Sequence, residues 1–223
     1  MHDSYDLNLN NMQQDKELVN YVADQLHGMI PIKLEKDKIL LQNALKVSIK
    51  RLKDCFSGIR IWDSNKFNIL QSQQYCTFLY LLANTIWKET GETSLPTRLF
   101  LLNKALNSIE LFYEVNMPKV FLIGHSVGSV FAKAVYGNRI VFFQNVTVGR
   151  VGSSAPVIGE NVVLYPQAVV SGASRIGNNC VVSAGCVIHN RNIPDNNIVY
   201  QRNGELIIEP NDKKHIDLYL NNI

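Results

Sequence analysis

The fold is decided by residues 157–188, which read VIGENVVLYPQAVVSGASRIGNNCVVSAGCVI. An aliphatic side chain recurs there at every sixth position, and a smaller side chain stands four residues after nearly every one. A period of six fits neither an α-helix nor a half-buried strand, which alternates every two residues. It fits a chain wound into a triangular prism, with one six-residue repeat on each face and the small residues at the turns. The aliphatic positions are Ile158, Leu164, Val170, Ile176, Val182 and Ile188, and the small ones are Val162, Ala168, Ser174, Cys180 and Cys186.

The same six-residue period extends upstream, with one interruption. The step from Val148 to Ile158 is ten residues long, so we expect an extra loop at about residues 150–156. The prism is therefore predicted to span residues 118–200 and to be followed by a polar C-terminal tail at 201–223. The inward positions expected upstream are Val130, Tyr136, Phe142 and Val148.

The preceding part of the chain, residues 1–117, has a helical period. Apolar residues recur at spacings of three and four in three runs, and a weaker run lies at about residues 15–29. Ser94 followed by Pro96 fits the first turn of the last long helix, because proline is tolerated where amides lack partners, and residues 116–118 are expected to end it. The predicted fold class is thus α+β, an N-terminal helical domain followed by a parallel β-helix. The three helical runs are 41–56, 75–86 and 99–113.

Length and composition exclude several classes of protein. The 223-residue chain has a formal net charge of +3, which is too small to indicate a nucleic-acid partner. Its four cysteines form no CxxC pair and no Cys/His cluster at metal-ligand spacing. No apolar run approaches the roughly 20 residues that span a membrane, and the N-terminus lacks the pattern of a signal peptide. We therefore expect a cytoplasmic protein with no metal, no membrane span and no bound nucleic acid.

Residues 124–128, GHSVG, match the G-x-S-x-G nucleophile elbow of α/β-hydrolases. Ser126 would then be a nucleophile, and His215 with Asp195 or Asp212 would complete a triad in the right chain order. The elbow needs a parallel sheet with crossover helices, whereas the sequence supplies six-residue repeats after it. A hydrolase is therefore not favoured, and His215 is expected to be an exposed residue of the polar tail.

Two motifs resemble those of the serine acetyltransferase-like group of hexapeptide acyltransferases. HSVGSV at 125–130 resembles the H-x-x-G-[ST/I]-V motif that carries the catalytic histidine of that family. QNVTVG at 144–149 resembles its Q-x-V-T-[LV]-G motif, and PVIG at 156–159 resembles its P-x-I-G motif. The run 75–116 is similar to the helical domain of members found in polysaccharide gene clusters. The resemblance covers roughly residues 40–200.

This resemblance implies a left-handed β-helix and an acyltransferase that uses acetyl-CoA as acyl donor. His125 would take the proton of the attacking hydroxyl as general base, a role that suits the near-neutral pKa of imidazoles in general. A backbone amide near Gly149 would stabilise the oxyanion. Gly149, Ala168 and Ala184 would line the pantetheine groove between two subunits of a homotrimer, which two trimers could extend to a hexamer. Coil geometry alone would also explain these three small residues, and the alternative for His125, a structural or merely exposed histidine, is not favoured.

The acceptor site departs from that of serine acetyltransferases. The family's acidic residue before the catalytic histidine is Gly124 here, and its Arg-His pair before P-x-I is Ser154-Ala155. A site without these charges should bind the ammonium and carboxylate of serine poorly. The family's A-G-x-P-A turn is also absent, since residues 193–200 read IPDNNIVY.

We therefore expect a sugar hydroxyl as acceptor, in a cell-surface polysaccharide or its precursor. Aromatic side chains bind sugar rings without charge, and the candidates near the histidine motif are Tyr136, Phe142 and Phe143. Two alternatives remain open. One is serine O-acetylation, and the other is a non-catalytic scaffold that uses the repeats only to assemble partners.

Overall fold

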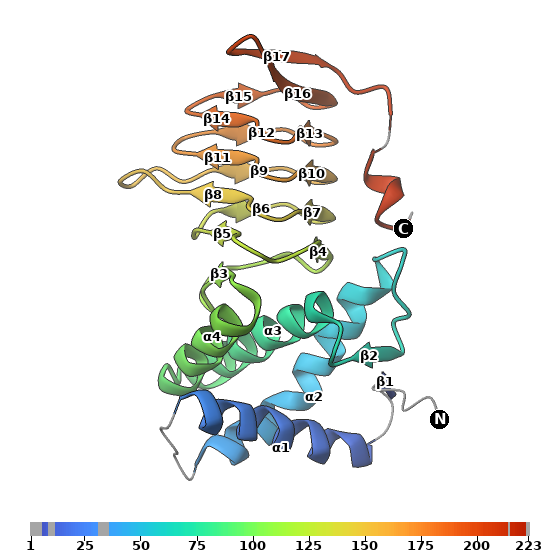
Figure 1. Cartoon of the computed structure of the whole chain (residues 1–223), viewed down its shortest axis with the longest axis vertical. Coiled ribbons are helices and arrows are strands. Elements are labelled where there is room, and N and C mark those ends of the chain that lie inside the picture. Colours follow the sequence, from blue (N-terminus) through green and yellow to red (C-terminus); the bar gives the residue numbers. More distant parts are fainter. Residues whose placement is uncertain (1–5, 9–11, 31–35, 214, 222–223) are drawn as a thin grey trace.

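The chain forms a helical base on which a triangular prism of parallel strands is stacked (Figure 1). The computed structural model describes residues 6–8, 12–30, 36–213 and 215–221. The prism is a left-handed β-helix of about 5 turns, so the predicted α+β fold class is confirmed. No helix among these described residues is both long enough and apolar enough to cross a membrane.

Four helices build the base. They occur where the helical periods predict them, and Ser94 begins the last one as expected. A short antiparallel pair joins β1 to β2 beside them. The bounds are α1 (Met12–Met29), α2 (Lys36–Ser57), α3 (Ser72–Thr90), α4 (Ser94–Asn107), β1 (Asp6–Asn8) and β2 (Lys66–Asn68).

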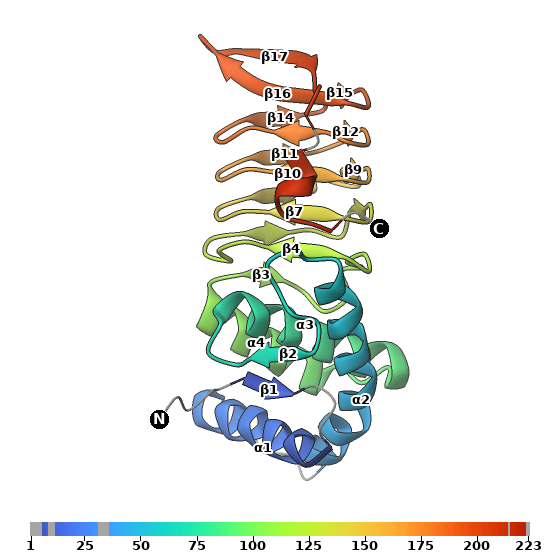
Figure 2. The ribbon, with the colours of Figure 1, turned by 90° about the vertical axis from the view of Figure 1, so that its right-hand side faces the viewer.

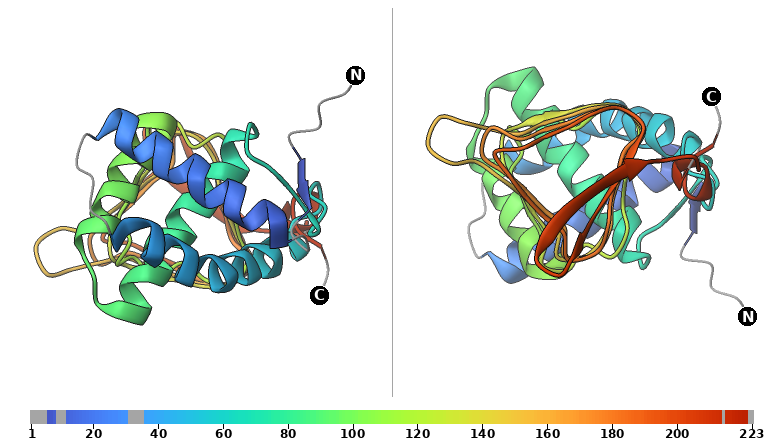
Figure 3. Two further views of the ribbon diagram at one scale, coloured as in Figure 1. Left: turned by 90° about the horizontal axis from the view of Figure 1, so that it is seen from below. Right: turned by 90° about the horizontal axis from the view of Figure 1, so that it is seen from above.

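Three parallel sheets form the faces of the prism, and each coil contributes one strand to each face (Figure 3). The first sheet contains β4 (Phe121–Ile123), β7 (Ile140–Phe142), β10 (Val162–Leu164), β13 (Val181–Val182) and β16 (Asn197–Arg202). The second contains β3 (Glu110–Leu111), β5 (Val130–Phe131), β8 (Thr147–Gly149), β11 (Val169–Ser171) and β14 (Val187–His189). The third contains β6 (Val135–Tyr136), β9 (Val157–Ile158), β12 (Arg175–Ile176) and β15 (Asn192–Ile193).

The six-residue period places the core as predicted from Tyr136 onward. Each expected inward side chain from Tyr136 to Ile188 is at most 8% exposed, and the small turn residues are buried completely. Parallel pairing stacks them coil on coil, for example Phe142 on Leu164. The expected extra loop also exists, since residues 150–156 project from the prism and carry a Val151–Ser154 bridge (Figure 3).

The prediction that Val130 points inward is wrong. Val130 is 39% exposed, whereas Phe131 is 2% exposed and pairs with Val148. The step from Phe131 to Tyr136 is five residues instead of six, which shifts the inward position by one residue relative to the downstream repeats. The wide turn at 124–129 makes the preceding step, from Ile123 to Phe131, eight residues long.

The prediction that the last helix extends past residue 107 to residues 116–118 is also wrong. Helix α4 ends at Asn107, and Ser108 adopts a left-handed conformation with φ of 51°. The carbonyl of Ser108 then accepts from the amide of Gly128, and the amide of Glu110 donates to Ser129. These bonds turn residues 110–111 into β3, so the parallel ladder begins before the proline that was expected to end the helix.

Helix α3 closes the lower end of the prism through buried hydrogen bonds. The Tyr80 hydroxyl donates to the carbonyl of Val115 at 2.6 Å and accepts from the amide of Met117 at 3.0 Å. The side chain of Asn84 donates to the carbonyl of Tyr113 at 2.6 Å. Burial raises the pKa of Tyr80 to about 12, so its hydroxyl stays protonated. Irregular backbone below the first coils is thereby satisfied without water.

The C-terminal residues are not an exposed polar tail. Strand β17 (Glu205–Pro210) pairs antiparallel with β16 at the upper end of the prism. The chain then returns along the first sheet to the 3-10 helix η1 (His215–Leu218), and Leu220 bridges to Ile59 (Figure 2). The outward side chains Val141, Val163 and Val181 of this sheet are buried as a result. His215 is half-buried, and its Nδ1 is a buried atom without a hydrogen-bond partner among the described residues.

Candidate active site at the His125 edge

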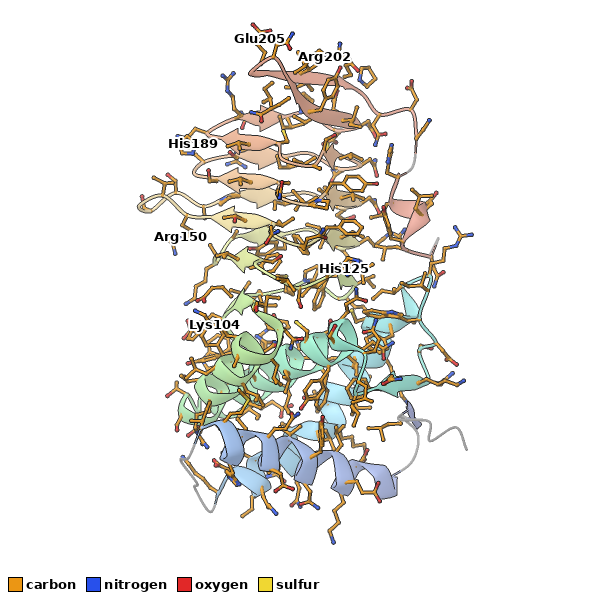
Figure 4. All side chains as sticks on the ribbon, viewed as in Figure 1. Lys104, His125, Arg150, His189, Arg202 and Glu205 are labelled. Atoms are coloured by element: carbon orange, nitrogen blue, oxygen red, sulfur yellow. The ribbon has the colours of Figure 1, made fainter. Side chains whose placement is uncertain are left out.

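His125 lies at the turn from the first to the second sheet in the lowest complete coil (Figure 4). It follows β4, is exposed, and has a left-handed backbone with φ of 58°. Three residues on, Gly128 has φ of 72°, and a Cβ there would come 2.1 Å from Oδ1 of Asn145. Only glycine fits this position, so the G in the histidine motif is required by the turn that presents the imidazole.

The first turn of α3 contacts the imidazole. The side-chain amide of Gln73 faces Nδ1 of His125 at 3.5 Å. Gln71 caps the helix by accepting from the amide of Gln74 at 2.8 Å, and it donates to Oε1 of Gln73 at 2.7 Å. Nε2 of Gln73 is thus directed at the ring, and Nδ1 is the acceptor. The helical base therefore orients His125, and no pattern in the sequence predicts this contact.

Ser126 is not a nucleophile. Its side chain is buried, 4% exposed, and its hydroxyl hydrogen-bonds with the thiol of Cys76 on α3. Burial raises the pKa of Cys76 to about 12, which keeps the thiol neutral. The parallel strands around Ser126 belong to a prism, and no crossover helix joins them in the described part of the chain. The hydrolase alternative is therefore excluded by the fold.

Two columns of side chains run up the edge of the prism above His125, which we call the His125 edge. Backbone hydrogen bonds stack the first column, as the amide of Gly124 donates to Phe142 and that of Phe143 to Leu164. The Oε1 atom of Gln144, one coil above His125, is buried and has no hydrogen-bond partner among the described residues. A donor on a bound ligand would satisfy it. The columns are Gly124, Phe143, Tyr165 and Ser183, and His125, Gln144, Pro166 and Ala184.

An aromatic stack occupies the first of these columns. The rings of Phe143 and Tyr165 are stacked 5.4 Å apart with an interplanar angle of 6°, and Tyr219 packs edge-on against both. Phe143 also fills the space beside Gly124, where a Cβ would come 3.2 Å from its ring. An acidic side chain at position 124 would therefore displace Phe143. Tyr136 and Phe142, the other aromatic candidates, lie in the core at 8% and 0% exposure.

The three residues predicted to line a coenzyme groove do not lie together. Ala184 is exposed in the same column as His125, three coils higher, or about 14 Å at the usual strand spacing. The side chain of Ala168 is 0% exposed and points into the prism. Gly149 lies at the opposite end of the second sheet, where the extra loop begins. The backbone amides of Gly149 and Thr147 point the same way, toward the coil above. The amide of Thr147 donates there to the carbonyl of Ala168.

The described residues contain no cluster of three or more side chains that could hold a metal ion. An exposed imidazole held from one side by an amide can accept or return a proton.

Comparison with known proteins gives likenesses for parts of the chain. Residues 155–190 match the family model described as bacterial transferase hexapeptide, six repeats. The chain is 29% identical over 118 residues to a serine acetyltransferase of Synechococcus elongatus, covering 51% of this chain and 48% of that protein. It is 29% identical over 121 residues to a putative serine acetyltransferase of Schizosaccharomyces pombe, covering 49% and 42%. Residues 155–190 are thus similar to hexapeptide repeats, and about half of the chain is similar to serine acetyltransferases. The chain spans less than half the length of these two relatives.

Solved structures extend the likeness to the helical base. A serine acetyltransferase of Neisseria gonorrhoeae superposes with a TM-score of 0.70 at 18% identity, covering 94% of this chain and 85% of that one. A serine acetyltransferase of Brucella abortus gives a TM-score of 0.69 at 15% identity, covering 91% and 86%. At such identities the likeness concerns the fold, helices included.

Proposed function

We propose that this protein is an acetyl-CoA-dependent O-acetyltransferase whose acceptor is a hydroxyl group of a sugar. The single observation that carries the proposal is the setting of His125. It is an exposed imidazole in the histidine motif, oriented by Gln73 and placed beside a half-exposed aromatic stack. The hexapeptide match and the named relatives support acyl transfer as the class of reaction.

In this mechanism the hydroxyl oxygen attacks the thioester carbonyl while Nε2 of His125 removes its proton. The tetrahedral intermediate then collapses, the carbon–sulfur bond breaks, and the imidazolium returns the proton to the leaving thiolate. Gln73 donates toward Nδ1 in the structure, which leaves the proton of the neutral ring on Nε2. The side-chain amide of Gln73 must therefore rotate when Nε2 of His125 acts as base, so that the amide oxygen accepts a hydrogen bond from Nδ1–H.

The acyl donor would follow the His125 edge and the turns near it. Ala184 offers an exposed small residue above His125, and Gly149 would line the groove from a neighbouring subunit. Coil geometry does not demand glycine at 149, because a Cβ there would make only ordinary contacts of 3.6 Å and 3.8 Å. Ala168, by contrast, has its methyl group inside the prism and would contribute backbone only. The oxyanion donor would be a backbone amide near Gly149.

A homotrimer would assemble through the second sheet. The outward side chains of its strands form a register-aligned row, in which Val130, Thr147, Val169 and Val187 stack from coil to coil. Val130 and Val187 are 39% and 47% exposed. An apolar row on a flat face fits a second copy of the same face or edge, and it would bring Gly149 of one chain toward His125 of the next.

The sugar acceptor is favoured by what replaces the charged groups of the resembled family. Phe143 occupies the place beside Gly124 where an acidic side chain would stand. The stack of Phe143 and Tyr165 offers a half-exposed apolar surface to a sugar ring. Serine is the second candidate, because both curated relatives are named as serine acetyltransferases.

The experiment is a screen of acetyl-CoA consumption with the full chain, offering serine and a panel of saccharides, with His125→Ala beside it. We expect acetyl transfer to at least one saccharide, little to serine, and loss of transfer in His125→Ala. Turnover with serine alone would mean that the acceptor is serine and not a sugar. Failure to bind acetyl-CoA would instead favour a non-catalytic scaffold.

A further inference from the structure

Charged side chains are distributed unevenly around the prism. Residues 118–200 contain six Lys or Arg residues and only two acidic ones. Both acids lie on turns from the third to the first sheet. Four of the cations lie at or beside the turns from the second to the third sheet, where the extra loop projects. We call this the loop edge. The acids are Glu160 and Asp195, and the four cations are Lys133, Arg150, Arg175 and Arg191.

Three of these cations are available to a ligand. Lys133 is paired with Glu114, but Arg150, Arg175 and Arg191 are exposed. None of the three has a carboxylate within 4.0 Å among the residues that the structure describes. Exposed guanidinium groups without internal partners raise the local concentration of anions and bind carboxylate or phosphate in a bidentate fashion.

The three arginines stand on three consecutive coils. Arg150 follows Gly149, which pairs with Ser171 in the next coil, and Arg175 lies four residues after Ser171. The amide of Arg175 donates to the carbonyl of Arg191 in the coil above at 2.9 Å. Consecutive coils are about 4.8 Å apart. The charges therefore rise along an open edge in steps of one coil and do not converge on a point, as they would around one compact phosphate.

A cavity of about 490 Å³ lies elsewhere, under the returning C-terminal segment, whereas one of about 610 Å³ continues the loop edge at its upper end. Arg191, Asn192 and Gln201 supply polar groups to the second cavity, and Val187, Leu206 and Ile208 supply apolar surface. His189 also lines it, with Nδ1 at 2.9 Å from Ser171 Oγ and Nε2 at 2.9 Å from Asn190 (Figure 4). Glu205 is its one acid and comes from β17 at the upper end, so anionic groups of a ligand belong below it, at Arg191, Arg175 and Arg150.

We propose that the loop edge is a docking surface for an acidic saccharide chain, whose carboxylate or phosphate groups pair with Arg150, Arg175 and Arg191. One sugar unit of an extended chain is about as long as one coil is high, so successive charges meet successive arginines. The cavity above would take an uncharged unit, with polar side chains for its hydroxyl groups and an apolar wall for its ring face. This deepens the proposed function, on which it rests, by naming the acceptor as anionic.

The test measures binding to the full chain by calorimetry, without acetyl transfer. The probes are an oligogalacturonate, a neutral malto-oligosaccharide of equal length, a nucleoside diphosphate sugar and coenzyme A. The variant Arg150→Gln/Arg175→Gln/Arg191→Gln is compared with Lys46→Gln/Lys50→Gln/Lys119→Gln, which removes three exposed positive charges away from the loop edge. Circular dichroism checks that both variants fold.

We expect the oligogalacturonate to bind with a Kd that rises about threefold for each arginine removed, or roughly 30-fold in the triple variant. The lysine control should change this Kd less than twofold, and added salt should weaken binding to the wild type. If the nucleoside diphosphate sugar shows this pattern instead, the arginines bind one compact diphosphate, and the proposal of an extended acidic chain is overturned.

Equal affinity of the arginine and lysine variants for every acidic saccharide would overturn the inference. So would a loss confined to coenzyme A, which would assign the arginines to the coenzyme. Because binding is measured without turnover, the two proposals fail separately. Charge-dependent saccharide binding with no acetyl transfer would contradict only the proposed function, and acetyl transfer unaffected by the arginines would contradict only the docking surface.

Discussion

The two edges of the second sheet differ in kind although the same short strands connect them. The two columns of the His125 edge contain no Lys, Arg, Asp or Glu, and they present an imidazole, an aromatic stack and small side chains. The loop edge presents three exposed arginines on consecutive coils. The inward residues of both edges obey the same six-residue rule. The buried positions of the repeats thus determine the shape of the prism. The exposed turn positions can vary, so that one edge has an imidazole and the other has positive charge.

The largest effect expected from this contrast is on turnover. His125→Ala should lower kcat for acetyl transfer by about 10²–10⁴-fold, the usual contribution of a general base. Lys119→Ala is the control, because Lys119 is exposed and belongs to neither edge. Steady-state kinetics of the two variants decide the matter. Similar rates for both would remove the distinction between the edges.

The aromatic stack should act on the acceptor. Phe143→Ala removes one ring from the His125 edge and should raise the KM for a saccharide acceptor up to about tenfold, with kcat and the KM for acetyl-CoA nearly unchanged. Initial rates at varied acceptor and fixed acetyl-CoA measure this split. Phe143→Leu is the control, because leucine fills the space beside Gly124 without an aromatic face. A change in the KM for acetyl-CoA alone would assign Phe143 to the coenzyme.

The orientation of His125 by the helical base gives a smaller effect. Gln73→Ala removes an exposed amide contact of 3.5 Å and should lower kcat about fivefold while leaving both KM values in place. Nitrogen NMR of the His125 imidazole should show a change in the balance between its two neutral tautomers. Gln73→Asn should restore neither kcat nor this balance. Unchanged kcat and an unchanged NMR signature would mean that α3 supports the fold without touching the reaction.

Gly149 gives the smallest effect and tests why the residue is small. Gly149→Ala should leave the melting temperature within a few degrees, because a Cβ there meets only ordinary contacts. The KM for acetyl-CoA should nevertheless rise if the turn approaches the coenzyme. A thermal melt beside the KM measurement separates a role of Gly149 in coenzyme binding from a requirement of coil geometry. A large drop in melting temperature would show that coil geometry requires glycine.

Residue patterns predicted the prism well because burial inside it depends on local periodicity. Every coil from Tyr136 to Ile188 repeats one simple packing rule, so the sequence alone indicated the sheets, the small turn residues and the extra loop. The rule failed where a turn departs from six residues. Val130 was placed inside because it lies six residues before Tyr136, whereas the inward residue before Tyr136 is Phe131, only five residues away.

Contacts between distant segments could not be predicted from these patterns. Gln73 lies 52 residues before His125, and no spacing rule joins a helix cap to a prism turn. Helix α4 ends early because Ser108 and Glu110 bond to the coil above, not because a helix breaker intervenes. The C-terminal segment reads as polar, yet Ile216 and Leu220 bury it against the base and the first sheet. Tertiary pairing decided each case.

The most direct test of the uncharged His125 edge is the ratio of kcat/KM for the best saccharide acceptor to kcat/KM for serine, measured with the full chain and acetyl-CoA. We expect a ratio well above one, and both activities should be lost when His125 is replaced by alanine. A ratio below one, with serine turned over efficiently beside Phe143 and without an acidic residue at position 124, would contradict it.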